Sequence, residues 1–365
     1  MFIYVVLLIC SLFFLIRSGT FSDSFGYNSQ TSLYRGFKRG QGTVFMMIFC
    51  VILISLRSKT VGIDTPSYIE EFNTVNWLEI KQYYNDLTIT HTEIGYLLFM
   101  YCLKSLGLSS QFLFIMESII IMIPLTLFVN KFSKNPAFSI LLFICFDYFG
   151  FALTGTRQTI ADGLILLSFL KISEKRILPS LLLFVAAVSF HTSSLIALPL
   201  LFLHKIPLNK ITLLFAAGLA AVVYMYKENL IVIIQLINLK NASVGEQETG
   251  GMGYYYFLLS YLVLIIIIKI KEAFKKSDND VLFWMIIISI IIYPALTFNP
   301  TMFRLHYYYS IASIIVLPNL IYSFTKNRII RMAFSCFYLA IAIFYYFNYP
   351  LSVMGIVPYE IKALL

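Results

Sequence analysis

Long uninterrupted apolar runs constrain this chain more than any other feature of its sequence. The stretches LVLIIIIKI at 262–270 and MIIISIIIYP at 285–294 contain almost no polar side chain. A transmembrane α-helix needs roughly 20 predominantly apolar residues, whereas the strands of a membrane β-barrel alternate polar and apolar residues. The runs therefore predict membrane-spanning helices and exclude a barrel.

The composition agrees with that interpretation. Of the 365 residues, 59% are hydrophobic and 12% are charged, whereas soluble domains carry about 25% charged residues. We therefore predict an all-α, polytopic integral membrane protein that forms one domain over residues 1–365. The apolar runs give about 12 transmembrane helices, at 2–16, 43–56, 111–129, 137–153, 157–173, 177–190, 192–204, 211–226, 254–270, 281–297, 305–324 and 332–347.

Clusters of lysine and arginine predict which loops face the cytoplasm, because cytoplasmic loops carry an excess of cations. The formal net charge of +9 follows from the same bias, and we expect no nucleic acid partner from it. Eighteen of the 27 lysines and arginines lie in clusters that this rule places inside: Arg17, Arg35, Lys38, Arg39, Lys131, Lys134, Lys171, Lys175, Arg176, Lys205, Lys210, Lys269, Lys271, Lys275, Lys276, Lys326, Arg328 and Arg331.

One short segment decides the orientation of everything after it. Residues 94–106, IGYLLFMYCLKSL, include Lys104 and would span only about 20 Å as a helix. If this segment crossed the membrane, the cation clusters from Lys131 onward would lie outside. We therefore predict a short re-entrant helix, which makes 57–93 an extracytoplasmic segment and 227–253 a second extracytoplasmic loop.

The sequence indicates neither a disulfide framework nor a metal or nucleotide site. The five cysteines are odd in number, lie within apolar runs and show no CxxC spacing, so disulfides and metal binding are not expected. GxxxxGK[ST] and HExxH motifs do not occur, which leaves a nucleotide-driven or zinc-protease-type mechanism without a motif. The first sixteen residues have no preceding cation and no small-residue cleavage site, so we expect a retained first span.

The segment SLRSKTVGIDTPSYIEEF, residues 55–72, concentrates polar side chains where a predicted helix leaves the membrane. Arg57 is either an interfacial anchor or a binding residue. Asp64 can cap a helix that begins directly after it with a proline in the first turn, or it can act as a general base near an arginine. Tyr68 follows one turn later and shares a helix face with Asp64.

Further polar residues lie at predicted helix ends on the same side. Glu93 precedes the re-entrant run, where the helix dipole favours a carboxylate. Arg157 lies in LTGTRQTIADG; because arginine is costly in a membrane, function is its default explanation, and its guanidinium suits diphosphate oxygens. Asp162 either pairs with Arg157 or only neutralises it. His191, at a turn, is either a hydrogen-bonded wall residue or a proton shuttle.

Arg304 lies in FNPTMFRLHYYYSI, where Asn299 and Pro300 interrupt the preceding helix. The tyrosines that follow it, at 307–309, form either an interfacial aromatic belt or a surface on which sugar rings stack. His306, between the arginine and the tyrosines, receives no role.

Four short motifs follow one another over residues 50–200. They are Arg57-x4-Gly62-x-Asp64-Thr65-x2-Tyr68, Glu93-x-Gly95-Tyr96, Arg157-Gln158-x-Ile160-Ala161 and Phe190-His191-x-Ser193. Together they resemble the EpsG-type, or Wzy-like, polysaccharide polymerases. Arg304 resembles the C-terminal arginine of that family more weakly, and residues 17–42 resemble nothing in it.

The resemblance implies a membrane glycosyltransferase that links oligosaccharide repeat units at the outer face of the cytoplasmic (inner) membrane, for exopolysaccharide, capsule or O-antigen biosynthesis. Such proteins move the growing chain from one undecaprenyl diphosphate to a sugar hydroxyl of the next unit. The glycosyl diphosphate bond holds the energy, so neither a nucleotide nor another cofactor is needed. Membrane lipid, a chain-length regulator and the flippase of the same pathway are the expected partners.

The candidate residues then receive roles as a hypothesis. Arg157 and Arg304, with Arg57, clamp the diphosphate and stabilise its charge, and Gln158 belongs to the same motif as Arg157. One of three groups accepts the proton of the acceptor hydroxyl: Asp64, Glu93 or His191. Tyr68 and the tyrosine cluster, with Tyr308 at its centre, hold sugar.

Three other functions stay open at this point. A polysaccharide ligase would use the same lipid donor and differ only in its product. A transporter or flippase of lipid-linked sugar would also need a polar cavity, but it should contain inverted repeats with paired broken helices, which this sequence does not show. A purely structural membrane partner would leave the polar residues on one side without a reason.

Overall fold

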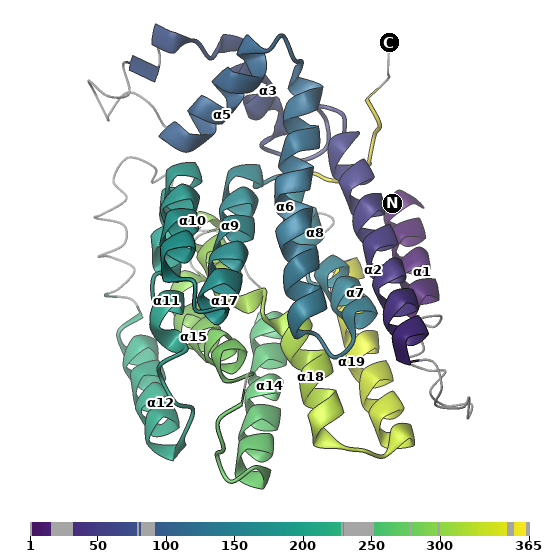
Figure 1. Ribbon diagram of the computed structural model, residues 1–365, viewed down its shortest axis with the longest axis vertical. Helices are drawn as coiled ribbons and strands as arrows, with labels where there is room; N and C mark the ends of the chain where they lie inside the picture. The colour runs from purple at the N-terminus through teal and green to yellow at the C-terminus, as the bar shows by residue number, and fades with distance from the viewer. Residues whose placement is uncertain are drawn as a thin grey trace. The chain divides into compact units, whose positions relative to one another are not determined.

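The computed structural model describes residues 2–15, 32–78, 80–81, 92–227, 229, 252–277, 279–297, 300–348 and 354–362. Every regular element in these residues is a helix (Figure 1), and their only β-type pairing is an isolated bridge between Arg57 and Ile361. The prediction of an all-α protein is confirmed.

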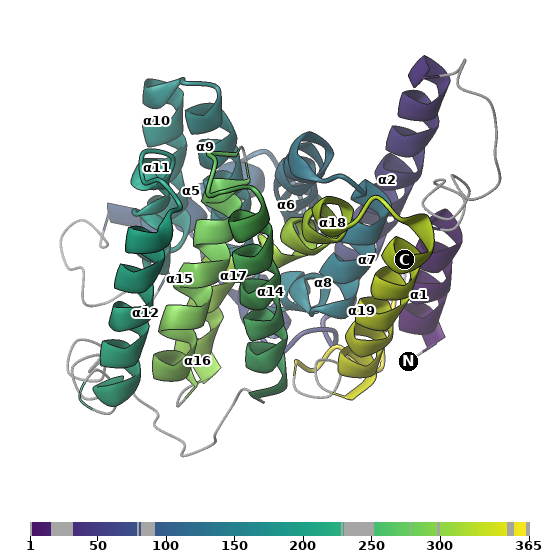
Figure 2. The ribbon, with the colours of Figure 1, turned by 90° about the horizontal axis from the view of Figure 1, so that it is seen from below.

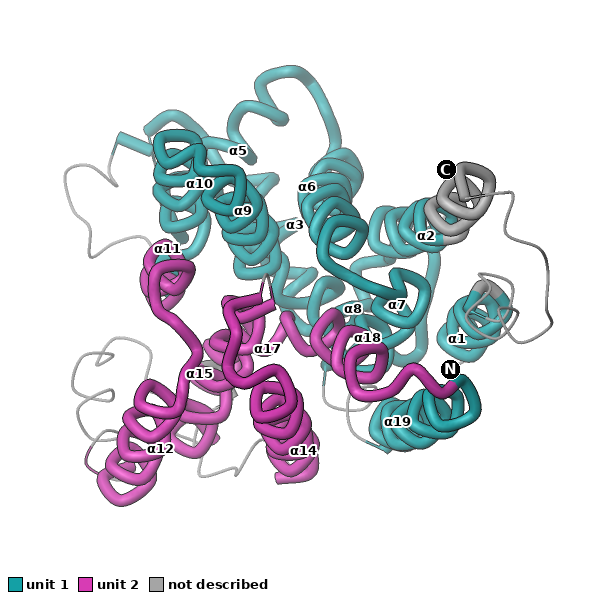
Figure 3. The backbone as a smooth tube through the Cα atoms, turned by 60° about the horizontal axis from the view of Figure 1, so that its bottom comes forward, with its two compact units in different colours: residues 1–195, 328–365 teal, residues 196–327 magenta. Residues whose placement is uncertain are grey.

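The chain forms two compact units, which Figure 3 shows in two colours. Unit 1 comprises Met1–Leu195 and Arg328–Leu365, and unit 2 comprises Ile196–Asn327. The last helix, α19 (Arg328–Asn348), therefore packs with the N-terminal half of the chain.

Unit 1 contains most of the residues that carry the sequence motifs. Its described helices, besides α19, are α1 (Phe2–Leu15), α2 (Ser32–Ser55), α3 (Thr65–Thr74), α5 (Ile94–Ser105), α6 (Ser110–Phe132), α7 (Pro136–Cys145), α8 (Tyr148–Ala152), α9 (Thr156–Ser173) and α10 (Ile177–Phe190).

Four helices of unit 1 pack side by side in the order α2, α6, α9 and α10 (Figure 1). The contact between α9 and α10 is close because small side chains lie in it: Ser168 Oγ is 2.9 Å from Ser180 Oγ and also donates to the Ser180 carbonyl at 2.8 Å. Small polar residues of this kind let membrane helices approach each other and hydrogen-bond across the interface.

Helix α7 lies against α1, α2 and α19 (Figure 2). It begins after Asn135, whose side chain accepts a hydrogen bond from the Phe138 amide at 3.3 Å, with Pro136 in the first turn as expected for a helix start. It ends before Asp147, whose φ of 72° is left-handed. The predicted span 137–153 is therefore interrupted, because a left-handed residue cannot continue an α-helix.

Side-chain contacts define two opposite ends of unit 1. At one end, Gln111 at the start of α6 donates to the carbonyl of Ser55 at the end of α2. At the other end, Lys131 near the end of α6 donates to Ser173 Oγ at the end of α9, at 2.9 Å. We call the first the motif end and the second the cation end, which also carries Lys171, Lys175 and Arg176.

Helix α5 begins and ends at the motif end. Glu93, directly before it, contacts Arg157 at the start of α9 at 2.8 Å. Lys104 in its last turn donates to the carbonyl of Asn73 at 2.5 Å, at the end of α3, and the start of α3 lies beside Thr154. Both ends of α5 therefore lie at the same end of unit 1; that this segment is re-entrant in the membrane stays a prediction.

Unit 2 is also helical throughout its described residues. Lys269 near the end of α14 forms a buried ion pair with Asp280 at the start of α15, at 2.7 Å, and α12 packs against α15. The elements are η3 (Thr192–Ala197, which begins in unit 1), α11 (Leu200–Leu203), α12 (Lys210–Met225), α14 (Met252–Lys271), α15 (Asp280–Leu296), α16 (Pro300–Phe303), η4 (Arg304–His306), α17 (Tyr307–Ser310) and α18 (Ser313–Phe324).

The helices support a multi-pass membrane protein, but they do not confirm 12 spans. Among the described residues, four helices are long and apolar enough to cross a membrane, and shorter apolar helices occupy most of the other predicted spans. The four are Ser110–Phe132, Met252–Lys271, Arg304–Phe324 and Arg328–Asn348.

Two further boundaries differ from the prediction. The span 192–204 is broken into η3 and α11 around Pro199, because proline lacks an N–H and clashes with the preceding turn. Helix α2 begins at Ser32, inside the expected loop 17–42. Most of the predicted loop 227–253 lies outside the described residues.

Candidate active site

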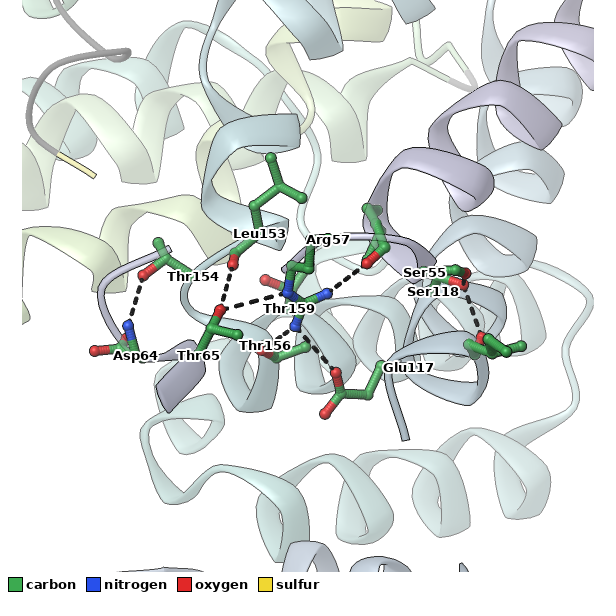
Figure 4. Close-up of polar contacts among 12 residues, drawn as sticks. Ser55, Arg57, Asp64, Thr65, Glu117, Ser118, Leu153, Thr154, Thr156 and Thr159 are labelled. Atoms are coloured by element: carbon green, nitrogen blue, oxygen red, sulfur yellow. Dashed lines mark hydrogen bonds and ion pairs between the residues drawn. The ribbon is translucent and has the colours of Figure 1, made fainter. Parts of the chain in front are cut away.

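Two polar clusters lie at the motif end of unit 1. The inner cluster centres on Arg57, directly after α2. Its Nη2 is 3.4 Å from Glu117 Oε2 on α6, and both side chains are 0% exposed. Its Nη1 donates to the Ile54 carbonyl at 2.8 Å, and its guanidinium carbon lies 3.9 Å from the centre of the Phe114 ring. Figure 4 shows the Arg57 guanidinium directed at Glu117.

Two threonines connect this buried arginine to the starts of α3 and α9. Arg57 Nε donates to Thr65 Oγ1 at 3.4 Å, and Nη2 donates to Thr156 Oγ1 at 3.5 Å (Figure 4). Thr65 Oγ1 itself donates to the carbonyl of Val61 at 2.6 Å. All the contacts described for the Arg57 guanidinium are therefore with other groups of the protein, which is the environment of a structural arginine.

Gly62 explains why the first motif contains a glycine. Its φ is 90°, and a Cβ built on it would lie 2.2 Å from the carbonyl oxygen of Leu153. Only glycine allows both that backbone conformation and that approach. The loop that carries Arg57 and Asp64 is therefore held directly against the segment that precedes α9.

Asp64 does not serve as the predicted helix cap. Its side chain makes no capping hydrogen bond to α3, and its backbone N–H donates to Thr154 Oγ1 at 3.3 Å instead (Figure 4). The side chain is half-buried. Its carboxylate also lies close enough to Tyr68 to act electrostatically on that phenol.

Two tyrosines connect the inner cluster to the outer one. Tyr96 on α5 donates to Glu117 Oε1 at 2.6 Å. Its ring meets that of Tyr68 on α3 edge-to-face, with centroids 5.7 Å apart. Arg157 in turn hydrogen-bonds the Tyr68 hydroxyl. Both tyrosines are buried, so this connection is part of the protein interior.

The outer cluster joins three sequence motifs through one carboxylate. Glu93 Oε2 accepts a hydrogen bond from Arg157 Nη1 at 2.8 Å. Glu93 Oε1 lies 2.8 Å from His191 Nδ1 and accepts from the Thr192 amide at 3.1 Å. The starts of α5 and α9 and the end of α10 thus bring together one acid, one arginine and one histidine, each of which is a predicted site residue.

Exposure separates the two clusters. In the outer cluster the side chains of Arg157, Glu93 and His191 are 25%, 15% and 26% exposed, whereas the Arg57–Glu117 pair is fully buried. A charged group must reach its substrate to bind it or exchange a proton with it. The outer cluster therefore has the geometry of a reactive site, and the inner cluster that of its support.

The ionisation of Glu93 narrows its role. Burial raises the pKa of Glu93, but the hydrogen bond and charge of His191 and the charge of Arg157 outweigh burial and lower this pKa from its ordinary value of 4.5 to about 2. A carboxylate held so firmly in its charged form is a weak proton acceptor near neutral pH. Glu93 is instead suited to orienting Arg157 and His191.

The other predicted site residues are placed as follows. Gln158 is buried beside Arg157. Asp162 is not the ion-pair partner of Arg157, since Glu93 takes that position. Arg304 is half-buried in η4 of unit 2.

The tyrosines at 307–309 do not form an exposed surface. Tyr308 is 1% exposed, and its neighbours are also buried. Tyr309 donates to the carbonyl of Ile196 at 2.5 Å, and the Tyr307 ring packs on His306 with centroids 4.6 Å apart. Neither an interfacial belt nor an open sugar-stacking face is therefore present, because these rings fill the interior of unit 2.

Sequence analysis overlooked Glu117. It is the single carboxylate in the apolar run 111–129, and an acid in a predicted membrane helix is itself a signal of a buried partner or a functional group. The sequence analysis also gave no role to Tyr96, although that residue belongs to the second motif. Within the described ranges, no three His, Cys, Asp or Glu side chains come together as a candidate metal site.

A protein-family model matches residues 43–361, and the family is the EpsG family. The chain belongs to the EpsG family. This is a family of Wzy-type polysaccharide polymerases, so the resemblance carried by the four motifs is confirmed. The matched residues include both clusters, Arg304 and most of the C-terminal segment 354–362. Comparisons with curated proteins and with solved structures find no match.

Proposed function

We propose that this EpsG-family protein polymerises oligosaccharide repeat units carried on undecaprenyl diphosphate, and that the reaction takes place at the Glu93–Arg157–His191 cluster. The partial exposure of this hydrogen-bonded cluster at one end of unit 1 carries the proposal. Family membership supports the reaction class, and the chemistry of the three side chains supports the lipid diphosphate donor.

The proposed reaction is a glycosyl transfer. A hydroxyl oxygen of the acceptor repeat unit attacks the anomeric carbon of the donor chain. The bond from that carbon to the diphosphate oxygen breaks, and its electron pair leaves with the lipid diphosphate. The hydroxyl proton passes to a base on the protein and from there to water or to the departing diphosphate.

Arg157 is the proposed stabiliser of the leaving diphosphate. A guanidinium has five N–H donors in a planar fork that matches phosphate oxygens. It can therefore hold Glu93 and Tyr68 and still bind an anion. Fixed donors aimed at developing negative charge provide much of the rate enhancement in such sites.

His191 is the proposed base. When Nδ1 carries the proton that it shares with Glu93 Oε1, 2.8 Å away, Nε2 is the nitrogen with a free lone pair. Glu93 then fixes the tautomer and orientation of the ring, as the carboxylate does in a catalytic triad. Asp64, half-buried one turn before Tyr68, is the alternative base.

The remaining predicted residues receive supporting roles. We propose that Arg57, fully buried, positions the loop that carries Asp64 and does not contact substrate itself. Tyr68 and Gln158 hold Arg157 in place. The prediction that Arg304 binds diphosphate stays a prediction, and the buried Tyr308 supports the segment of unit 2 that carries it.

The site is proposed to face away from the cytosol in the cytoplasmic membrane. The cation end of unit 1 carries Lys131, Lys171, Lys175 and Arg176, and the positive-inside rule assigns such an end to the cytoplasm. The motif end, with the outer cluster, then faces out. A chain-length regulator and the pathway's flippase remain proposed partners.

Reconstitution tests the proposal. Purified protein in lipid vesicles receives a synthetic undecaprenyl-diphosphate repeat unit, and products are resolved on a gel. We expect a ladder of chains that remain on the lipid carrier. Transfer of sugar to another acceptor without lengthening would indicate a ligase, movement of the intact lipid across the bilayer would indicate a flippase, and either would overturn the polymerase proposal.

Two arginine variants, one in the cluster and one as a control, make this assay specific for the cluster. Arg157→Ala should lower turnover by about 10²-fold or more, because it removes the donor aimed at the leaving diphosphate. Arg176→Ala removes an exposed cation at the cation end and should leave the ladder unchanged. Equal activity in the two variants would contradict the role of Arg157.

A further inference from the structure

The C-terminal segment 354–362 lies antiparallel along the loop that follows α2. Its contacts are backbone hydrogen bonds: the Ser58 amide donates to Glu360 at 2.9 Å, the Gly62 amide to Gly355 at 2.9 Å and the Lys362 amide to Leu56 at 3.0 Å. The Arg57–Ile361 bridge belongs to the same pairing. Residues from opposite ends of the chain thus form a short two-stranded contact within unit 1.

Side chains fix the segment in this place. Thr60 Oγ1 donates to Glu360 Oε2 at 2.7 Å. Tyr359 donates to the Leu53 carbonyl in the last turn of α2 at 2.5 Å, and Tyr4 on α1 donates to the Ile356 carbonyl at 2.6 Å. The segment is therefore tied to α1, to α2 and to the loop at once.

The contact with Ile63 requires a glycine in the segment. Gly355 has a φ of 63°, and a Cβ built on it would lie 2.9 Å from Ile63 Cγ1. Its carbonyl holds the Gly62 amide and that of Met354 holds the Ile63 amide, at 2.9 and 3.3 Å. The segment is thus hydrogen-bonded to the loop at the turn immediately before Asp64.

The loop that the C-terminal segment contacts, Leu56–Asp64, carries two residues of the candidate active site. Arg57 lies at the start of this loop. Its ion pair with Glu117, and the hydrogen bond from Tyr96 to Glu117, connect the loop to the outer cluster. Asp64 stands at its end and begins α3, which presents Tyr68 to Arg157. The loop from Leu56 to Asp64 has no helix of its own, so its conformation depends on partners outside it.

We propose that the C-terminal segment Met354–Lys362 is a positioning element of the active site, which fixes the Leu56–Asp64 loop so that Asp64 and the start of α3 are correctly placed for the transfer. This inference rests on the proposed function for its catalytic consequence. The segment contacts no member of the outer cluster in the described structure, so it acts through the loop.

A matched glycine pair tests the positioning role. Gly355→Ala introduces a methyl group against Ile63, whereas Gly107→Ala is made at a glycine with a similar φ of 73° and no heavy atom within 4 Å of its Cβ. Both variants carry the same backbone strain. We expect kcat for chain extension to fall on the order of tenfold to 100-fold in the first variant alone, since small misplacements have effects of this size.

Glu360 supplies the conservative control. Glu360→Gln keeps an oxygen that can accept the Thr60 hydrogen bond and should retain activity, whereas Glu360→Ala removes it and should lower kcat more than it raises KM. Equal kcat in wild type, Gly355→Ala and Glu360→Ala would overturn the positioning role while leaving the polymerase proposal intact.

A crosslink tests the contact without any assay of activity. Thr60→Cys and Glu360→Cys are combined in a variant that lacks the five natural cysteines, and membranes are treated with an oxidant. We expect a disulfide between the two sites, detected as a linked peptide by mass spectrometry, and an unfolding temperature of the reduced variant equal to that of the cysteine-free protein. Absence of the link would overturn the inference, whereas a link in this variant combined with no ladder from the wild-type protein would overturn the proposed function alone.

Discussion

At the residue scale, two arginines of the same sequence pattern have opposite environments. Arg57 is 0% exposed and paired with Glu117, while Arg157 keeps 25% exposure beside Glu93. Removing one partner of a buried ion pair leaves the other charge buried without compensation, which is destabilising. A partly exposed guanidinium can instead exchange a contact with the protein for a contact with an anion. The exposure of the side chain, more than the residue type, therefore distinguishes the proposed supporting arginine from the proposed reactive one.

The role of His191 predicts a pH dependence. Because a general base works only in its deprotonated form, turnover should fall as the pH is lowered. Glu93 cannot cause this fall, since its pKa is lowered to about 2. His191→Asn should reduce turnover by about 10²–10⁴-fold and abolish the acidic limb of the pH–rate profile.

The control for this measurement is His204→Asn, at a half-buried histidine of unit 2. It should keep both the rate and the acidic limb of the wild type. An acidic limb that persists in His191→Asn would assign the proton transfer to another group, and Asp64 would be examined first.

The Arg57–Glu117 pair predicts a double-mutant cycle. Arg57→Met or Glu117→Met alone leaves one charge buried without its partner and should destabilise the protein by about 3–5 kcal/mol. The double variant removes both charges and should be more stable than either single variant. Unfolding in detergent, followed by tryptophan fluorescence, measures the three changes; additive losses would contradict a direct pair.

At the scale of elements, α5 carries Glu93 and must pack closely on the end of α10. A Cβ on Gly95 would lie 2.4 Å from Ser189 Oγ and 2.6 Å from the Ser189 carbonyl oxygen. Gly95→Ala should therefore displace the start of α5, reduce chain extension and lower the unfolding temperature. The effect is expected although alanine is the better helix former.

Gly218→Ala is the matched control for that prediction. Gly218 lies within α12, and nothing lies within 4 Å of its Cβ position. This variant should be neutral or more stable by up to about 1 kcal/mol, the difference in helix propensity. If the two variants behaved alike, the close packing of α5 on α10 would be wrong.

The elements also show how far the sequence alone reaches. Helices α6, α9, α10 and α12 agree closely with the predicted spans, because apolar length and flanking cations specify them. The break at Asp147 could not be predicted, because a left-handed residue leaves no periodicity to detect. The break after η3 has a signal in the sequence, Pro199, which the predicted span 192–204 ignored.

The candidate site divides in the same way. The motifs indicated Glu93, Arg157 and His191, and the structure brings these three together. Glu117 was missed because its function depends on Arg57, sixty residues away in sequence, and the C-terminal segment was missed because its contacts use mainly backbone atoms. Pairings of this kind are fixed by tertiary packing, which a single sequence does not display.

At the scale of the whole molecule, the account depends on the orientation of unit 1 in the membrane. The motif end and the cation end are opposite, and our proposal that the motif end faces outward comes from the charge rule. If the orientation were reversed, the outer cluster would meet cytosolic nucleotide sugars and not lipid-linked chains that have crossed the membrane. Orientation therefore decides between glycosyl transfer at the outer face and any function in the cytosol.

Labelling in intact cells measures this orientation most directly. Glu70→Cys on α3 and Lys175→Cys between α9 and α10, both at exposed positions, are made separately in a variant without natural cysteines and treated with a membrane-impermeant maleimide. We predict that the cysteine at position 70 is labelled in intact cells and that the one at position 175 is labelled only after lysis. Labelling of position 175 but not position 70 in intact cells would contradict the proposed active site at the outer face.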